Sequence, residues 1–308
     1  MVKLSVVIPC YNSSKSLEEL SLRLDNSLQK LKISYEVIFV NDYSKDSTLV
    51  VAKDIVEQYK SFRVIDMMFN VGQAKALYCG LENSNGEYVV TMDDDLEHKP
   101  EDIVKLYNKI NSDENIDVVF GNRIEKKHSA LRRFGSFMIG KLNEKIFNKP
   151  KEISLSPFRI LRRKLVETIT SHRTMFPILG LMILKSTRRM SSINIEHQAR
   201  KYGESNYSLA MLIKITFDNI INFSSLPLKY ISYIGLGASL LSFLLALLYI
   251  LKYFIFGVGV SGWTTLVVLI NFYSGLILLS IGIIGEYLIR ILSEVQGYPI
   301  YKIRNIYE

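Results

Sequence analysis

The chain has 308 residues, of which 48% are hydrophobic and 22% charged, and a net charge of +8. This composition is typical of a folded protein and argues against a largely disordered chain. The mean hydropathy of +0.16 is high for a soluble protein. The excess lies near the C-terminus, where Lys252 is the one charged residue among the 55 positions from Ile231 to Gly285. A wholly soluble protein is therefore excluded, and two cysteines, Cys10 and Cys79, are too few for a disulfide framework or a zinc site.

The basic excess lies mostly in the polar part of the chain. Residues 227–308 contain five Lys or Arg and three Asp or Glu, so residues 1–226 hold six of the eight net positive charges. Basic proteins bind nucleic acids, anionic membrane surfaces or phosphate-bearing substrates. Because apolar segments follow, we expect a lipid bilayer and a phosphate-bearing substrate as partners, and no nucleic acid.

Apolar runs alternate with helical periodicity along the first 120 residues. The run from Val2 to Ile8 is too short for a signal peptide and predicts a buried strand over residues 4–8. Further strands are expected at residues 36–40, 62–67, 88–92 and 117–120, with helices at about 16–31, 47–59, 72–82 and 100–110. Continuous apolar strands that alternate with helices predict an α/β fold with a mostly parallel, Rossmann-like sheet covered on both faces.

Two amphipathic stretches follow, at about residues 130–149 and 208–226. Leu131, Phe134 and Met138 fall on one helical stripe with basic residues around it. Basic amphipathic helices often lie in the membrane interface, although any surface helix that covers a sheet shows the same pattern. We expect interface association, because candidate membrane spans come next.

Residues 231–256 and 263–289 are each longer than the roughly 20 residues that a helix needs to cross a bilayer. A buried hairpin in a soluble core would need an apolar partner surface of similar length, which the sequence does not offer. The flanking basic residues are Lys229, Arg290, Lys302 and Arg304. The positive-inside rule then places both termini in the cytoplasm. We expect a cytoplasmic domain over residues 1–226 and a multi-pass membrane domain over residues 227–308, with two transmembrane helices and a short cytoplasmic tail.

Acidic residues follow the predicted strand at 88–92. Asp93, Asp94, Asp95 and Glu97 lie where ligands bind in open parallel sheets, beyond the carboxyl ends of the strands. Such carboxylates repel each other unless a cation lies between them, and Mg²⁺ commonly bridges carboxylates and substrate phosphates. The alternative is an acidic turn or helix N-cap.

Polar residues also follow the first three strands. Tyr11 can stack on a base, Asp42 can accept hydrogen bonds from one, and Lys75 can reach a phosphate. Together these positions predict a nucleotide site built by successive strand ends. Neither a G-x-G-x-x-G nor a G-x-x-x-x-G-K-[ST] motif is present, so a dinucleotide cradle or P-loop is not supported.

These motifs resemble those of family 2 glycosyltransferases with the GT-A fold. The resembling segments are Pro9-Cys10-Tyr11-Asn12, Asn41-Asp42-Tyr43-Ser44-Lys45-Asp46, Asn70-Val71-Gly72, Asp93-Asp94-Asp95-Leu96-Glu97-His98-Lys99-Pro100, Gly121-Asn122-Arg123, Ser156-Pro157-Phe158-Arg159, Arg200 to Tyr207, Gly285-Glu286-Tyr287 and Pro299-Ile300-Tyr301. The later segments are similar to the polyprenyl-phosphate branch, which includes bactoprenol glucosyltransferases and dolichol-phosphate mannose synthases. Residues 203–207 also resemble the aminoarabinose-transferring relatives.

The resemblance implies a role for each matching residue. Mg²⁺ or Mn²⁺ on the donor diphosphate would be held by Asp93, Asp95 and Glu97. The nucleotide would be bound by Pro9, Tyr11, Asn12, Asp42, Lys75, Asp93 and Asp94. The acceptor phosphate would be bound by Arg123, Arg132, Ser136 and Arg200, and the residues expected to act in catalysis are Asp95, Arg123 and Arg159. The alternatives are interfacial anchoring for Arg132 and a structural salt bridge for Arg159.

The sequence departs from the family pattern at several positions. Asn41 stands where many relatives have Asp, and Pro157 stands where Gly is usual. An acidic residue that precedes this second motif in some relatives is missing, and Glu152 is the nearest candidate. We therefore name no catalytic base. A phosphate monoester has a second pKa of about 6 and is already anionic near neutral pH, so direct in-line attack with inversion at the sugar needs none.

The expected function is transfer of one sugar from a nucleotide sugar, with a UDP-sugar implied by the resemblance, to undecaprenyl phosphate or a similar polyprenyl phosphate. The expected location is the cytoplasmic face of the bacterial inner (plasma) membrane, and the product is a lipid-linked sugar for envelope polymer modification. A homo-oligomer formed through the transmembrane helices is left open. Rival functions are a degenerate membrane scaffold without catalysis and a transferase with a non-lipid acceptor. A processive polysaccharide synthase would carry a Q-x-x-R-W motif, but the only tryptophan is Trp263.

Overall fold

The structure is a computed structural model that describes residues 2–123, 150, 153–195, 226–256 and 262–308. It divides into two compact units, Met1–Asn206 with Pro299–Glu308, and Tyr207–Tyr298. The amphipathic stretch expected at 130–149 lies outside the described residues, as does the one at 208–226 except for its last residue.

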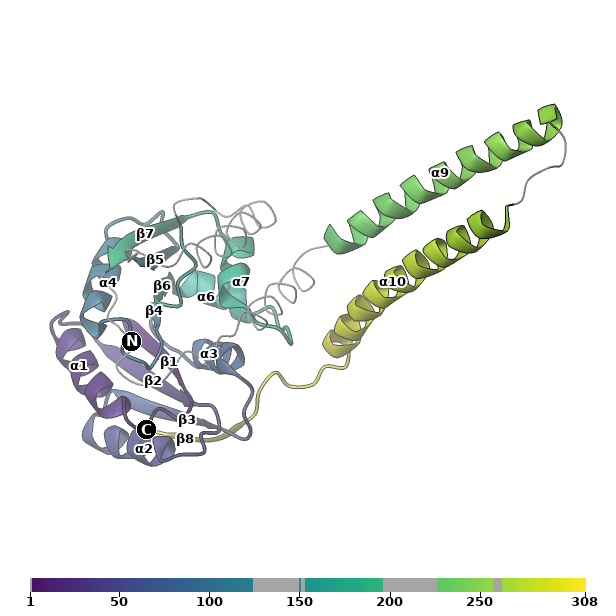
Figure 1. The fold of residues 1–308 in the computed structure, drawn as a ribbon. Coiled ribbons are helices and arrows are strands. Elements are labelled where there is room, and N and C mark those ends of the chain that lie inside the picture. Colours follow the sequence, from purple (N-terminus) through teal and green to yellow (C-terminus); the bar gives the residue numbers. More distant parts are fainter. Residues whose placement is uncertain (1, 124–149, 151–152, 196–225, 257–261) are drawn as a thin grey trace. The chain divides into compact units, whose positions relative to one another are not determined.

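The first 123 residues alternate between strands and helices, as the sequence predicts (Figure 1). The strands are β1 (Leu4–Cys10), β2 (Tyr35–Asn41), β3 (Phe62–Met67), β4 (Tyr88–Thr91) and β5 (Val118–Arg123). The helices are α1 (Leu17–Gln29), α2 (Thr48–Gln58), α3 (Gln73–Glu82), the 3-10 turn η1 (Pro100–Asp102) and α4 (Ile103–Asn111). The predicted alternation is confirmed, with small differences at the element ends.

Five further elements complete the first unit and were not predicted. They are β6 (Arg159–Arg162), α6 (Arg163–Thr170), α7 (Leu179–Ser186), β7 (Met190–Ile195) and β8 (Ile303–Tyr307). All eight strands form one sheet in the order β7-β5-β6-β4-β1-β2-β3-β8. The pairs β1–β2, β1–β4, β2–β3 and β5–β7 are parallel, and the pairs β4–β6, β5–β6 and β3–β8 are antiparallel. The sheet is therefore mixed, with a parallel centre, as in the GT-A fold.

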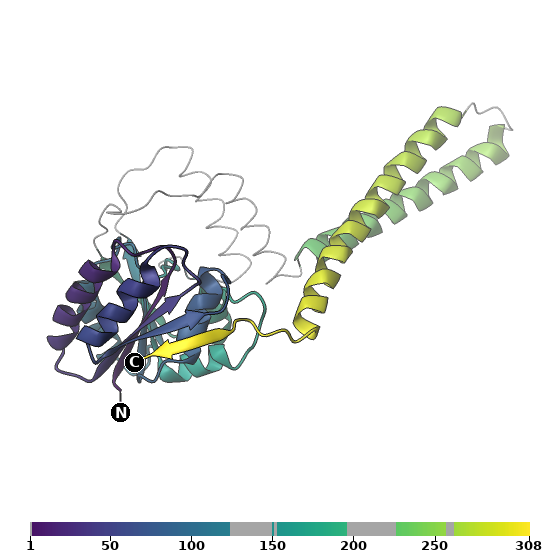
Figure 2. The same ribbon diagram turned by 90° about the horizontal axis from the view of Figure 1, so that it is seen from below.

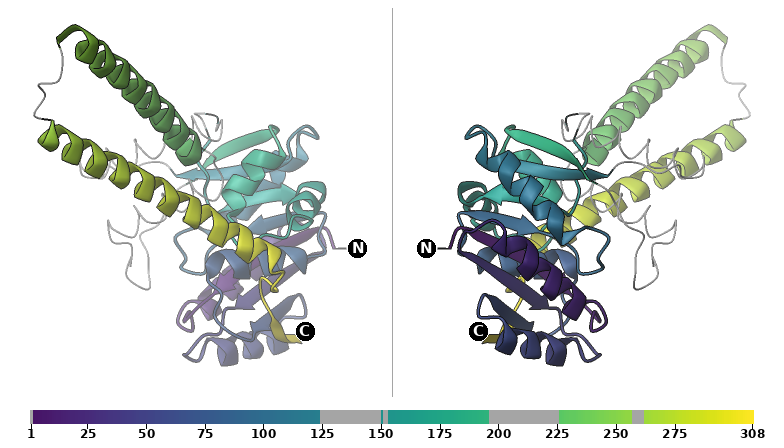
Figure 3. Two further views of the ribbon diagram at one scale, coloured as in Figure 1. Left: turned by 90° about the vertical axis from the view of Figure 1, so that its right-hand side faces the viewer. Right: turned by 90° about the vertical axis from the view of Figure 1, so that its left-hand side faces the viewer.

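Helices cover both faces of the sheet (Figures 1 and 3). On one face, α1, α2 and α4 pack over Leu4, Val6 and Ile8 of β1 to form the main core. On the other face, α3 packs against β1 and β2 so closely that a Cβ on Gly80 would lie 2.2 Å from Val7. Because side chains alternate along a strand, both faces of β1 are buried, which explains its uninterrupted apolar sequence.

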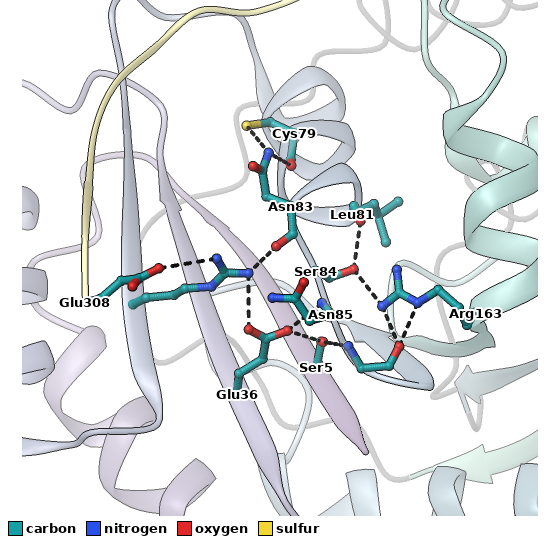
Figure 4. A network of polar contacts seen from close by, with 11 residues as sticks. Ser5, Glu36, Cys79, Leu81, Asn83, Ser84, Asn85, Arg163 and Glu308 are labelled. Carbon is teal, nitrogen blue, oxygen red and sulfur yellow. Dashed lines mark hydrogen bonds and ion pairs between the residues drawn. The ribbon is translucent and has the colours of Figure 1, made fainter. Parts of the chain in front are cut away.

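A buried polar network closes the amino-terminal edge of the sheet (Figure 4). Arg63 at the start of β3 pairs with Glu36 of β2, with 3.1 Å between Nη2 and Oε2. Glu36 also accepts hydrogen bonds from the Ser5 hydroxyl at 2.5 Å and from the Asn85 N–H at 2.7 Å. The network thus joins β1, β2 and β3 to the turn before β4, at the edge opposite to the carboxyl strand ends.

The C-terminal residues join this sheet. β8 pairs antiparallel with β3, matching Ile306 with Ile65 and Asn305 with Asp66, and is drawn in yellow in Figure 2. Residues 227–308 were expected to form one membrane domain with a short cytoplasmic tail, whereas residues 299–308 group with the sheet. The physical reason is that β8 satisfies the backbone hydrogen-bonding groups of β3, which would otherwise form an open edge.

The second unit contains two long helices, α9 (Leu226–Phe256) and α10 (Trp263–Val295). Within α10, Leu269–Val295 is long and apolar enough to cross a membrane, with a mean hydropathy of 1.9. Its apolar side chains are exposed, as Leu278 at 69% illustrates. In α9, the shorter segment Tyr230–Leu245 is apolar. Among the described residues, one helix is therefore both long enough and apolar enough to span a membrane.

Candidate active site at the carboxyl edge of the sheet

The loops after β1, β2 and β3 are tied to one another by hydrogen bonds. The Asn12 N–H donates to the Ser44 hydroxyl at 3.0 Å, and the Lys45 N–H donates to Asn12 Oδ1 at 2.9 Å. Asn12 has a φ of 55°, in the left-handed region that asparagine tolerates better than most residues. Asn12, which we expected at the nucleotide, thus bridges the first two loops and fixes the exposed Tyr11 beside it.

Asp42 holds the third loop against the second. Its carboxylate is buried and accepts hydrogen bonds from the N–H groups of Val71 at 2.7 Å and Gly72 at 2.8 Å. Burial raises the pKa of Asp42, and these two hydrogen bonds oppose that rise. Gly72 has a φ of +88°, which a residue with a Cβ rarely adopts. A sharp turn at glycine therefore lets both N–H groups reach one carboxylate.

The acidic residues after β4 are crowded and partly buried. The Gln73 amide donates to Asp93 at 2.7 Å, and the Ser13 hydroxyl donates to Asp94. Burial raises the pKa of Asp93 to about 7, and repulsion from Asp95 and Asp94 adds to the rise. Burial likewise raises the pKa of Asp94 to about 6. A cation bound between such carboxyl groups would stabilise their ionised forms, so their raised pKa values are consistent with a cation site.

Arg159 lies beside this acidic group because β6 runs antiparallel to β4. Its backbone pairs with Thr91, so the first residue of β6 lies next to the last residue of β4. The side chain is 5% exposed, and its Nε donates to the Thr91 hydroxyl at 3.3 Å. Burial lowers the pKa of Arg159 to about 10, against the attraction of Asp93. Its buried Nη1 has no hydrogen-bond partner among the described residues.

The donor set suits a hard divalent cation. Carboxylate oxygens are the ligands that Mg²⁺ prefers, and they also suit Mn²⁺. The Glu97 N–H donates to Asp95 Oδ1 at 3.0 Å across Leu96, which has a φ of 60°. Within the described ranges, no three His, Cys, Asp or Glu side chains form a complete ligand cluster.

Most of the predicted site residues meet at this edge of the sheet. They are Pro9, Tyr11, Asn12, Asp42, Lys75, Asp93, Asp94, Asp95, Glu97 and Arg159. Lys75 lies half-buried in the first turn of α3, two residues after Gln73. Arg123 ends β5, which runs parallel to β4, so its backbone lies at the same edge. Its side chain lies outside the description, as do Arg132, Ser136 and Arg200.

Sequence reasoning missed two residues that hold the acidic group. Ser13 and Gln73 bind Asp94 and Asp93, but hydroxyls and amides after strands are too common to stand out. The departures from the family pattern now have structural counterparts. Asn41 donates to Asp66 at 2.7 Å with both side chains buried, and the Pro157 carbonyl accepts from Thr91 at 2.6 Å. Glu152 lies outside the described residues.

Comparison with protein-family models decides the family. The model for glycosyl transferase family 2 matches residues 5–170, from the second residue of β1 to the end of α6, with the whole acidic loop between them. The chain belongs to glycosyltransferase family 2. It is therefore a glycosyltransferase, and the enzyme class and fold expected from its sequence motifs are confirmed.

Two relatives match this family 2 chain over nearly its full length. The uncharacterized glycosyltransferase sll0501 of Synechocystis sp. is 34% identical over 313 residues, covering 99% of this chain and 96% of the relative. The undecaprenyl-phosphate 4-deoxy-4-formamido-L-arabinose transferase of Pseudomonas aeruginosa is 31% identical over 305 residues, covering 98% of this chain and 89% of the relative. The resemblance to the polyprenyl-phosphate branch is thereby confirmed.

Solved structures confirm the fold of this family 2 enzyme. Glucosyl-3-phosphoglycerate synthase from Mycobacterium tuberculosis, crystallised with Mn²⁺, uridine diphosphate and glucosyl-3-phosphoglycerate, matches with a TM-score of 0.53 and 21% identity. The match covers 71% of this chain and 78% of that one. Mannosyl-3-phosphoglycerate synthase from Rubrobacter xylanophilus matches with a TM-score of 0.53 and 13% identity, covering 71% and 72%.

Proposed function

We propose that this family 2 glycosyltransferase transfers one sugar from a nucleotide sugar to undecaprenyl phosphate or a similar polyprenyl phosphate. The observation that carries this proposal is the similarity to undecaprenyl-phosphate sugar transferases, which extends over 98% of this chain and 89% of the relative, beyond the catalytic sheet. A non-lipid acceptor would not require an apolar helix such as Leu269–Val295. The product is a lipid-linked sugar, which suits modification of an envelope polymer.

The donor nucleotide binds at the loops after β1, β2 and β3. Tyr11 is 46% exposed and offers an aromatic face to a base. Asp42 keeps lone pairs on both oxygens after accepting from Val71 and Gly72, so it can accept from a base as well. A UDP-sugar is the donor class we favour, because the glucosyl-3-phosphoglycerate synthase of similar fold was crystallised with uridine diphosphate.

Asp93, Asp95 and Glu97 would hold a divalent cation, Mg²⁺ or Mn²⁺. Bound there, the cation would supply positive charge to the donor diphosphate and to the leaving group. The raised pKa of Asp93 supports this assignment, as does the Mn²⁺ in the glucosyl-3-phosphoglycerate synthase structure. Gln73 and Ser13 orient the acidic loop through Asp93 and Asp94.

The residues of this chain have to bring the anionic donor diphosphate close to the anionic acceptor phosphate. Arg159 carries a buried N–H donor beside Asp93, where it can bind a phosphate oxygen of either substrate. Arg123, Arg132, Ser136 and Arg200 complete the acceptor phosphate site. The phosphate monoester is already ionised near neutral pH, since its second pKa is about 6. Its oxygen attacks C1 of the sugar while the bond from C1 to the donor diphosphate breaks, so the nucleoside diphosphate leaves and the configuration at C1 is inverted.

The site works at the cytoplasmic face of the bacterial inner membrane. Two membrane spans at residues 231–256 and 263–289 place both termini in the cytoplasm, where nucleotide sugars and the acceptor headgroup meet. The exposed apolar surface of α10 supports a location at a membrane. The same surface would also serve a homo-oligomer.

The test is a lipid-transfer assay with the purified full-length enzyme. We expect labelled sugar from one member of a UDP-sugar panel to enter the organic phase when undecaprenyl phosphate and Mn²⁺ are present, and EDTA to stop the transfer. Label that stays in water-soluble products would favour a non-lipid acceptor. Nucleotide binding without any transfer across the panel would favour the scaffold.

A further inference from the structure

The C-terminal strand begins beside the donor loops. Because β8 runs antiparallel to β3, the first residues of β8 lie next to the last residues of β3, at the carboxyl edge of the sheet. The Met68 N–H donates to the Lys302 carbonyl at 2.9 Å, which extends this pairing into the loop after β3. A segment more than 200 residues away in sequence therefore borders the nucleotide loops (Figure 2).

Arg304 of β8 contacts two of these loops. Its guanidinium carbon lies 5.5 Å from the centroid of the Tyr43 ring, a cation–π distance. Its Nη2 donates to the Met68 carbonyl at 3.3 Å. Tyr43 directly follows Asp42, has a φ of 55° and is 43% exposed. One side chain thus joins the loop after β2 to the loop after β3.

The loops that Arg304 joins are the two that meet at Asp42. The carboxylate of Asp42 binds the N–H groups of Val71 and Gly72 from the loop that Met68 begins. Any change in the spacing of these loops would move Asp42 relative to a bound base. Arg304 is therefore suited to fix the spacing of these two loops.

Other contacts anchor the C-terminal segment independently of Arg304. The Tyr301 hydroxyl donates to Glu82 at 2.5 Å, and the Lys53 ammonium lies 4.1 Å from the centroid of the Tyr307 ring. Glu308 lies 3.7 Å from Arg63. Because these contacts and the β3–β8 pairing remain, replacing Arg304 should leave the strand in place.

We infer that Arg304 is a positioning residue of the donor site, which holds the Tyr43 loop and the Met68 loop in the arrangement that binds the nucleotide. This inference rests on the proposed placement of the nucleotide at Asp42. Loss of an exposed cation–π contact and one charged hydrogen bond should weaken nucleotide binding about 3- to 10-fold.

The experiment is calorimetric titration of the full-length protein in detergent with UDP and Mn²⁺. Arg304→Ala should raise the Kd for UDP about 3- to 10-fold, whereas Arg304→Lys should stay close to wild type because a cation remains over the ring. Tyr43→Leu should also weaken UDP binding, by no more than Arg304→Ala, and the double variant should be no worse than Arg304→Ala alone, since Arg304→Ala already removes the cation–π contact. The KM for undecaprenyl phosphate and the melting temperature should not change.

Lys302→Ala is the matched control, since Lys302 is an exposed cation two residues before Arg304, directly before β8. Equal weakening by Lys302→Ala and Arg304→Ala would mean general attraction of the nucleotide to a basic edge, and would overturn the inference. So would a Kd for Arg304→Ala within about twofold of a wild type that binds UDP. A wild type that does not bind UDP would instead refute the proposed donor and the inference with it.

Discussion

At the level of single residues, the acidic loop after β4 makes the stability of the protein depend on pH. The pKa values of Asp93 and Asp94, about 7 and about 6, lie above the value of about 3.9 expected in an unfolded chain. The folded protein without metal therefore holds protons that the unfolded chain has lost. Its free energy of unfolding should fall as pH rises from about 4 to about 7.

A bound cation reverses this balance, because it favours the ionised carboxylates. We predict that Mn²⁺ binding in the presence of UDP is about tenfold weaker at pH 6 than at pH 8, since a group with a pKa of about 7 is mostly protonated at pH 6. Binding should also release protons, which calorimetry in buffers of different ionisation enthalpy measures. Asp93→Asn is the control, and should bind Mn²⁺ weakly with little pH dependence. The same affinity at both pH values would contradict the assignment of Asp93 as a ligand.

The stability of the protein should also depend on the identity of residue 41, which is Asn41. It donates to Asp66 from a buried position, so an aspartate there would place two buried carboxylates face to face. We predict that Asn41→Asp lowers the free energy of unfolding at pH 8 by about 1–3 kcal/mol, with a smaller loss at pH 5, where one of the two carboxyls can stay protonated. The swapped pair Asn41→Asp with Asp66→Asn should recover much of the loss in chemical denaturation. A swap as unstable as the single variant would show that the hydrogen bond is not the cause.

At the scale of elements, the polar network of Figure 4 joins strands at the edge away from the site. Glu36 and Arg63 have side chains only 11% and 12% exposed. Glu36→Ala would leave Arg63 buried without its main partner, and we predict a loss of about 3–5 kcal/mol in the free energy of unfolding. The Kd for UDP should not change.

Glu87→Ala is the matched control, because Glu87 pairs with Lys3 on the surface, at 50% and 37% exposure. Such exposed pairs contribute about 0–1 kcal/mol. Urea denaturation of the two variants measures the difference. Equal losses in the free energy of unfolding would mean that the buried Glu36–Arg63 pair contributes no more to stability than the exposed Glu87–Lys3 pair.

The elements also show how far the sequence could predict the structure. The strands at 4–8, 36–40 and 62–67 were found because each is an apolar run buried on both faces. β6 and β8, with four and five residues, mix charged and apolar side chains. Their place depends on pairing with strands far away in sequence, which no local pattern encodes. Arg159 was expected in the site from the resemblance of its motif, but its pairing beside Thr91 was not. The contacts of Arg304 emerged only from the fold.

At the scale of the whole molecule, the account requires the catalytic sheet and the C-terminus to lie on the same side of a membrane. We predict that a cysteine placed at position 260 reacts with an impermeant maleimide added to intact cells, whereas one placed at position 308 reacts only after lysis. The native Cys10 and Cys79 are buried and should not interfere. Labelling of position 308 from outside would contradict the two-span topology.

A comparison of two acceptor lipids tests whether a polyprenyl phosphate accepts the sugar. The purified enzyme, Mn²⁺ and the matching UDP-sugar are incubated with either undecaprenyl phosphate or undecaprenol. The lipids are then extracted, and their masses are determined by mass spectrometry. The account predicts a product one sugar residue heavier than undecaprenyl phosphate and no product from undecaprenol, because the attacking atom is a phosphate oxygen. Glycosylated undecaprenol, or sugar found only in water-soluble products, would contradict it.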